Sequence, residues 1–353
     1  MPIEHRFTNR HTIASYFASA HVHNGVCLGG NEQQILAVAG LTHAQLKHPK
    51  SRVLATQLAS IVKSCWRLSG DELLGFTQQK VKLGMFTLLA ERLIRCKSLE
   101  EVLVYSDTFY SLTGDQLQIK TEQCGSQVRV TVNANFKSNS ESIAVNSLLI
   151  ELLLLICHRF PSWLVGRVIP LSQIHVKHRK PTHHEEYRLM FPCPCIYQST
   201  HNMLVFDSKY LDLPVVQTAQ EWVKYADHIP LQWFKKQSYY DTCSTQVLRV
   251  LENSLLGKES NLDNVAVKLN MTSRTLRRKL IIEGSRFQQL KDNTRRDKAI
   301  HLFEQANLTI AQIGLAVGFT ELATFSRAFK HWTGVSPNTY RNHHLLTARG
   351  TKN

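Results

Sequence analysis

The sequence GFTELATFSRAFKHWTGVSP, residues 318–337, carries two helical patterns on different faces. The apolar pattern consists of Phe325, Phe329 and Trp332. The polar pattern consists of Thr324, Arg327 and His331. Spacings of three and four residues are typical of the faces of one helix, and the glycines at 318 and 334 predict its ends. The apolar face is predicted to be core, whereas the polar face is either only solvated or in contact with a partner.

An internal repeat extends this pattern over the last hundred residues. The first copy is LDNVAVKLN, a break at NMT, and SRTLRRKL, ending at residue 280. The second copy begins about 48 to 50 residues later with IAQIGLAV, a break at GFT, and ELATFSRAFKHW. Each copy predicts a helix, a turn of three or four residues and a second helix, with Thr272 and Thr320 as N-caps.

The two second helices align if the later copy holds one extra residue. The paired positions are then Leu276 with Phe325, Arg278 with Arg327, and Leu280 with Phe329. Helix pairs of this size also occur in plain structural bundles, so the pattern alone does not establish a reading surface.

The second helix of the first copy carries a basic cluster at Arg274, Arg277 and Arg278. Spacings of three and four residues put these guanidinium groups on one face, and the stretch offers no acidic partner. Guanidinium groups suit phosphate oxygens and the edge of guanine, which favours a major-groove reader over a plain bundle. The corresponding set in the second copy is Ala323, Thr324, Arg327, Lys330 and His331.

The charge distribution agrees with a polyanionic partner. The chain of 353 residues has a net charge of +15, and residues 241–353 hold 17 Lys and Arg against 9 Asp and Glu. The basic excess per residue is therefore larger in the last third than in the first 240 residues. This predicts contact with nucleic acid there.

These C-terminal residues resemble the DNA-binding domain of the AraC/XylS family of bacterial transcription regulators. The matching stretches are MTSRTLRRKL, DNTRRDKAIHLF, IAQIGLAVGF, FSRAFK and TGVSPNTYR, within about residues 245–342. The resemblance implies an all-α domain of seven helices, with two helix-turn-helix units joined by a connector helix. It also implies that the two second helices enter successive major-groove segments. Leu322 falls among the implied reading positions but can equally turn into the core.

The first two-thirds predicts an α+β domain. Residues 11 to about 112 have helical periodicity, whereas DQLQIKTEQ and QVRVTVNA alternate as strands of a hairpin from residue 115. A buried helix is predicted at 144–160, strands at 168–178 and 202–207, and a short helix at 181–191. Within the predicted helix at 144–160, the apolar stripe Leu148, Leu152, Leu155 and Ile156 is predicted to be core rather than pocket wall.

This region resembles, more faintly, the effector domain called the arabinose-binding domain in an AraC-type subfamily that includes regulators of amino-acid catabolism and of virulence. The matching stretches are LSGDELLGF, SLEEVLVYSDTFYSLTGDQLQI, VIPLSQIHVKHRKP and FPCPCIYQSTHNMLVFDSKYLDLP. The resemblance implies a small-molecule effector, but it does not make that effector arabinose. No pocket residues follow from it.

Enzyme and metal chemistry are not predicted. The chain has no Gly-rich phosphate loop, nucleophile elbow or paired carboxylates, so we expect no catalytic residues and no cofactor. Several histidines and the CPC sequence at 193–195 invite a zinc site, but CPC lacks the two-residue gap of a zinc knuckle, and we expect no metal. The histidines at 183 and 184, followed by Glu185 and Glu186, are predicted to lie on a solvated face. The eight scattered cysteines are predicted to be reduced core residues.

The sequence therefore predicts a sequence-specific transcription regulator. Residues 1–236 are expected to bind a small effector or dimerise, residues 241–345 to bind double-stranded promoter DNA, and residues 346–353 to form a tail. Activation is favoured over repression, RNA polymerase is a candidate partner, and a cytoplasmic location without membrane insertion is expected. Two alternatives stay open: a DNA-repair protein with a reactive-cysteine domain, and a nonspecific architectural DNA binder.

Overall fold

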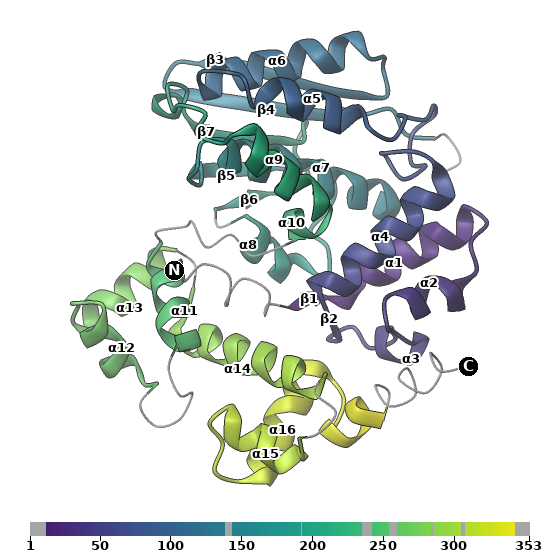
Figure 1. Ribbon diagram of the computed structural model, residues 1–353. Helices are drawn as coiled ribbons and strands as arrows, with labels where there is room; N and C mark the ends of the chain where they lie inside the picture. Colours follow the sequence, from purple (N-terminus) through teal and green to yellow (C-terminus); the bar gives the residue numbers. More distant parts are fainter. Residues whose placement is uncertain are drawn as a thin grey trace. The chain divides into compact units, whose positions relative to one another are not determined.

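The computed structural model describes residues 12–137, 143–191, 193–234, 242–253, 260–283, 285–304 and 308–342 (Figure 1). They form two compact units. The helical unit comprises the described residues within 12–19, 36–58 and 242–342, and the sheet unit comprises those within 20–35 and 59–234. The expected boundary at 236–241 and the tail at 346–353 lie outside the described residues, so the predicted division into domains stays a prediction.

The helical unit contains the predicted repeat. Its C-terminal helices are α11 (Cys243–Asn253), α12 (Leu262–Lys268), α13 (Ser273–Ile282), α14 (Phe287–Phe303), α15 (Ile310–Ala316) and α16 (Leu322–Thr333). Residues 337–342 are also helical, which gives the seven helical segments that the resemblance implied. One apolar core lies among α11 to α14 around Leu276 and Leu280. A second lies among α14 to α16 around Phe325 and Phe329, with Trp332 packed against it.

A two-stranded sheet from the start of the chain also belongs to the helical unit. Strand β1 (Thr12–Ala14) pairs antiparallel with β2 (Arg52–Leu54), and the short helix α3 (His43–Leu46) lies between them in sequence. Leu54 packs against the second core, and the Thr12 hydroxyl donates to Asp297 Oδ1 at 2.6 Å. The expectation of a mostly helical segment from residue 11 was therefore incomplete, because it missed both strands.

Several polar contacts between the two-stranded sheet and the connector helix α14 meet at Asp297 of that helix. Arg52 Nε donates to the Thr12 hydroxyl at 2.6 Å, and Arg296 Nε donates to Asp297 Oδ1 at 3.0 Å. Burial acts to raise the pKa of Asp297, but the charges of Arg296 and Arg52 and the Thr12 hydrogen bond outweigh it and lower that pKa. The carboxylate is therefore held ionised against the start of the chain.

The sheet unit is built on five strands in the order β3-β4-β7-β5-β6. The strands are β3 (Leu117–Cys124), β4 (Gln127–Ala134), β5 (Leu171–His175), β6 (Cys195–Ile196) and β7 (Met203–Asp207). β3 and β4 form the predicted hairpin, with Gly125 at φ +61° in its turn. The strands at 168–178 and 202–207 were predicted, whereas β6 was not. Among the strand pairs that the structure describes, only β5–β6 is parallel.

The sheet unit also contains the helices α5 (Met85–Leu93), α6 (Leu99–Leu112), α7 (Ile143–Leu164), α8 (Tyr187–Met190), α9 (Ala219–Asp227) and α10 (Leu231–Phe234), with the 3-10 helices η2 (His184–Glu186) and η3 (Ser208–Tyr210). Helices α1 (Ser15–Cys27), α2 (Glu32–Val38) and α4 (Ala55–Ser69) contribute residues to both units. α6 packs against β3, and α7 packs against β4 and β7. The predicted α+β unit followed by a helical region is confirmed.

Helix α7 is the buried helix that the sequence predicts. Its segment Asn146–Leu164 is long and apolar enough to cross a membrane by length and composition, but 83% of the window lies inside the protein. That burial is typical of a core helix. The cysteines are all free, and three of them, Cys65, Cys96 and Cys243, are buried. Cys27 and Cys124 are exposed, so the prediction that all eight are core residues was wrong for these two.

Candidate nucleic-acid interface and ligand cavity

The first helix-turn-helix unit is formed by α12 and α13. Thr272 is the N-cap of α13, and its hydroxyl accepts the backbone N–H of Thr275 at 3.2 Å, as predicted. Ala266 is fully buried where the two helices meet, and its carbonyl accepts the N–H of Met271 in the turn at 2.9 Å. The Ser273 hydroxyl donates to Asp263 on α12. These contacts fix the angle at which α13 leaves the turn.

The second unit repeats this design in α15 and α16. Four residues separate α12 from α13, whereas five separate α15 from α16, so the extra residue of the later copy lies in the turn. A Cβ at Gly314, on α15, would lie 3.2 Å from the Phe325 ring, so glycine lets the helices approach closely. Thr320 was expected to cap α16, but its N-cap is Glu321, without a capping side-chain hydrogen bond. That prediction was wrong because the longer turn moves the helix start by one residue.

The predicted reading residues lie on the surfaces of α13 and α16. Those on α13 are Arg274, Arg277 and Arg278. Those on α16 are Ala323, Thr324, Arg327, Lys330 and His331. All eight are exposed, while the neighbouring Leu276 and Phe325 are completely buried. Leu322, whose direction the sequence left open, is 49% exposed.

The arginines of these faces have no ion-pair or hydrogen-bond partner in the part of the chain that the structure describes. α13 also presents Lys279, so it exposes four cations and no carboxylate between residues 274 and 280. On α16 the Thr324 hydroxyl donates to Glu321 Oε2 at 3.2 Å, which places one carboxylate at the start of that face. The first face is therefore the more electropositive.

The connector helix supports the second turn. Arg295 Nη2 donates to the Gly318 carbonyl at 3.3 Å, and its guanidinium lies 4.8 Å from the centre of the Phe319 ring. Gly318 has φ +85°, a conformation that favours glycine. A side chain of α14 thus holds the turn from which α16 departs.

The sheet unit encloses a cavity of about 410 Å³. This volume falls within the usual range of small-molecule sites, roughly 300–1,000 Å³. Apolar side chains of α7 and β3 form much of its wall: Leu149, Leu152, Leu153, Ile156, Leu117 and Ile119. The sequence favoured core over pocket wall for the stripe on α7, and this was wrong for Leu152 and Ile156. Leu148 and Leu155 of the same stripe are buried.

Polar side chains also line the cavity, among them Thr87 and Tyr110, and those described next differ in how well they are paired. Glu72 accepts the N–H groups of Gly84 at 2.7 Å and Phe86 at 2.9 Å, while burial raises the pKa of its carboxyl. Lys63 and Arg67, exposed on α4, have no such partner among the described residues. Trp233 is 3% exposed, and its buried indole Nε1 has no acceptor within the described ranges.

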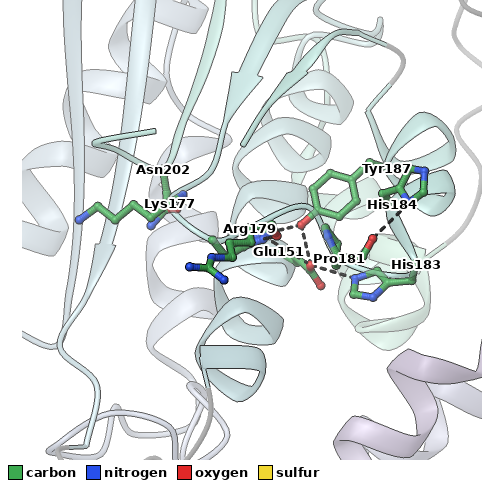
Figure 2. Close-up of polar contacts among 9 residues, drawn as sticks. Glu151, Lys177, Arg179, Pro181, His183, His184, Tyr187 and Asn202 are labelled. Carbon is green, nitrogen blue, oxygen red and sulfur yellow. Dashed lines mark hydrogen bonds and ion pairs between the residues drawn. The ribbon is translucent and has the colours of Figure 1, made fainter. Parts of the chain in front are cut away.

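A buried polar cluster lies elsewhere in the same unit, around Glu151 of α7 (Figure 2). The Tyr187 hydroxyl donates to Glu151 Oε1 at 2.5 Å, and His183 Nε2 lies 3.1 Å from the same oxygen. Burial, followed by the Glu151 charge, raises the pKa of Tyr187, so the phenol stays protonated and donates. His178 Nε2 lies 2.8 Å from the phenol oxygen, and its Nδ1 lies 2.8 Å from the Arg179 carbonyl oxygen.

This cluster overturns the expectation of a solvated face at 183–186. His183 and Glu186 are buried, and only His184 and Glu185 reach the surface. The signal that the sequence offered was Glu151, a lone carboxylate in an apolar helix, which requires buried partners. Among the described residues, no three His, Cys, Asp or Glu side chains gather as a metal site.

Comparisons with known proteins agree with both regions. Residues 29–215 match the family described as the arabinose-binding domain of AraC transcription regulator, and residues 265–343 match a helix-turn-helix domain. The ornithine utilization regulator of Pseudomonas aeruginosa is 22% identical over 315 residues, covering 89% of this chain and 91% of that protein. A transcriptional regulator of Mycobacterium bovis, uncharacterized and of helix-turn-helix type, is 40% identical over 97 residues, with 26% of this chain and 28% of that protein covered.

Among solved structures, the transcriptional regulator CdpR from Pseudomonas aeruginosa aligns with a TM-score of 0.30 and 20% identity. The alignment covers 72% of this chain and 80% of that one.

Proposed function

The chain belongs to the AraC family of transcription regulators, and from that premise we propose that α13 and α16 read promoter DNA. The observation that carries this proposal is one exposed arginine repeated at the same place in both units. Arg278 and Arg327 each lie two residues beyond a completely buried side chain, Leu276 or Phe325, and 49 residues apart. Such a position faces outward from a helix that the core holds in a fixed direction.

The two helices divide the work of binding. The four cations exposed on α13 supply most of the attraction to phosphate, with Arg274, Arg277 and Arg278 also able to reach guanine edges. On α16, Ala323 and Thr324 offer methyl groups to thymine, and Arg327 offers a guanidinium group. Lys330 and His331 follow near the end of α16, where they contact the DNA backbone.

A titration on selected DNA tests this proposal. The full chain first selects duplexes from a random pool, and fluorescence anisotropy then compares the selected duplex with a scrambled one. Arg278→Ala and Arg327→Ala are each expected to weaken binding to the selected duplex by about 5- to 150-fold, the value of one bidentate base contact. Arg95→Ala, an exposed arginine of the sheet unit, serves as the matched control and is expected to change nothing.

The dependence of DNA affinity on salt concentration distinguishes sequence-specific base contacts from nonspecific attraction to phosphate groups. Loss of one phosphate contact, expected for Arg274→Ala, lowers the slope of log affinity against log salt by about 1. A nonspecific architectural binder would instead hold the selected and scrambled duplexes equally tightly at fixed salt. That result, or full affinity in both the Arg278 and Arg327 variants, would refute the proposal.

We propose further that the cavity of the sheet unit is the effector site and that the effector favours one arrangement of the regulator for activating transcription. The family's description does not make arabinose the effector of this chain, because the walls that α7 and β3 contribute to the cavity are apolar. Assembly as a homodimer, contact with RNA polymerase and a cytoplasmic location complete the proposal. A promoter-reporter assay checks activation: deleting the gene should lower expression from the selected site, and a rise would identify a repressor.

A further inference from the structure

We propose that a segment from the first part of the chain binds DNA directly. Lys47 and Lys50, in the basic turn (residues 47–51) between α3 and β2, contact phosphate groups beside the groove segment that α16 enters. This inference rests on the proposed function, because it extends the DNA-binding surface beyond the two helix-turn-helix units. Three features point to it: the place of the turn, the charge around it and the exposure of its lysines.

The basic turn lies against the end of α16. Lys50 Nζ donates to the His331 carbonyl at 3.4 Å, and the His48 ring occupies the space that a side chain at Gly334 would need. The turn is itself held in shape, since the backbone N–H of Lys50 donates to His48 Nδ1 at 3.1 Å. Strand β2, which follows the turn, ends at Leu54, and Leu54 packs against the core that holds α16. The turn is therefore part of the surface of the second helix-turn-helix unit.

The charge around this turn favours a polyanion. Residues 36–58 of the helical unit contain no Asp or Glu. The cations of this segment are Lys47, Lys50 and Arg52. Residues 308–342 contain one carboxylate, Glu321, which precedes α16 at the end away from the turn. The cations there are Arg327, Lys330 and Arg341. Duplex DNA, with about one negative charge per 1.7 Å of its axis, is the partner that this charge fits.

The two lysines of the basic turn are exposed and have donors available. An ammonium group has three N–H donors, and Lys50 uses one of them on the His331 carbonyl. The side chain of Lys47 has no hydrogen-bond or ion-pair partner among the residues that the structure describes. A lysine near the end of a helix can also simply cap its last carbonyls, which would account for Lys50 but not for Lys47. A cap stabilises the fold, whereas a phosphate contact changes the salt dependence of DNA binding.

Fluorescence anisotropy of the full chain at several salt concentrations tests the assignment. Each phosphate contact that is lost should lower the slope of log affinity against log salt by about 1, and should weaken binding about fivefold at about 0.15 M salt. Lys47→Gln/Lys50→Gln should therefore lower the slope by about 2. It should weaken the selected and the scrambled duplex alike, because phosphate contacts carry no sequence information.

The matched control is Arg95→Gln/Lys97→Gln, which removes the same charge from exposed positions of the sheet unit. It should change the slope by less than about 0.5, because charges far from the DNA are screened by salt. A slope in Lys47→Gln/Lys50→Gln that equals the slope of this control overturns the proposal.

Two single variants separate a phosphate contact from a helix cap. Lys47→Gln should lower the slope by about 1 and leave the thermal midpoint unchanged, because the Lys47 side chain does not bind the end of α16. Lys50→Arg keeps the charge and should keep the slope of the wild type. A slope that falls only when Lys50 is replaced by Gln, together with a lower thermal midpoint, would identify Lys50 as a cap and overturn the proposal.

Duplexes with one neutral phosphate localise the contact. The selected duplex is prepared with a single methylphosphonate at each position along both strands, across the site and beyond it. At a phosphate that the lysines contact, the substitution should weaken wild-type binding about fivefold but should change the affinity of Lys47→Gln/Lys50→Gln by less than about twofold. If no position shows this difference, the lysines do not contact the DNA.

Failure of this inference is distinguishable from failure of the proposed function. A chain that prefers its selected duplex and responds to Arg278→Ala, yet keeps its salt slope in Lys47→Gln/Lys50→Gln, reads DNA without the basic turn. A chain that loses slope in that double variant but does not discriminate between duplexes retains the phosphate-binding surface and loses the proposed reading of DNA.

Discussion

Removing the Tyr187 hydroxyl is expected to destabilise the sheet unit through Glu151. The phenol is 2% exposed and donates to Glu151 Oε1 at 2.5 Å, and a hydrogen bond to a charged group contributes about 1.5–3 kcal/mol. Tyr187→Phe should therefore lower the free energy of unfolding by about 2–3 kcal/mol. In a Glu151→Leu background the acceptor is already gone, so the same substitution should cost less than about 1 kcal/mol.

Urea unfolding at pH 7.5 measures this difference in a double-mutant cycle. Four of the five tryptophans, at positions 66, 163, 222 and 233, lie in the sheet unit, so intrinsic fluorescence mainly follows that unit. With a slope of about 2 kcal/mol/M, the single Tyr187→Phe substitution should move the midpoint by about 1 M. Additive effects of the two substitutions, within about 0.5 kcal/mol, would mean that the hydrogen bond carries no coupling and that the reasoning is wrong.

Three further predictions concern the helical unit. Gly334→Ala should lower the free energy of unfolding by at least about 1–2 kcal/mol, because φ is +83° there and an added Cβ would meet the His48 ring; a thermal shift that is unchanged would contradict this. Thr272→Ala removes the α13 cap and should destabilise by about 1 kcal/mol in urea, with Thr275→Ala as a milder control. Asp297→Asn should destabilise at neutral pH. Since the folded-state pKa of Asp297 is lowered, its contribution is present above the unfolded-state pKa of about 4 and is lost as pH falls from there through the lower folded-state pKa, so the wild-type and Asp297→Asn curves should converge in strong acid.

The repeat was predictable because its residues follow local rules. Buried positions such as Leu276 and Phe325 recur at helical spacing, and the arginines two residues beyond them face outward for the same geometric reason. The helices on either side of each turn could therefore be predicted from the sequence. The exact first residue of α16 could not be predicted, because Thr320 and Glu321 can both begin a helix and only the packing of the turn decides between them.

Long-range partnerships could not be predicted in the same way. β1 and β2 have three residues each, too few for a period to be visible, and the buried Arg52 finds its partner Thr12 40 residues away. Likewise His183 has acidic neighbours and looks solvated in sequence, yet it meets Glu151 from 32 residues away.

Residues that line a cavity cannot be distinguished from core residues by their spacing in the sequence, since Leu152 follows the same periodicity as Leu148.

The attachment of β1 and β2 to α14 has a practical consequence for anyone dividing the protein. A fragment that begins at residue 238 would keep every predicted DNA-reading side chain but would lose Leu54 from beside its second core and Thr12 from beside Asp297. An apolar patch and a carboxylate without its hydroxyl partner would then meet water and other copies of the fragment. Poor solubility or altered DNA affinity of such a fragment would report on the missing first strands rather than on the effector.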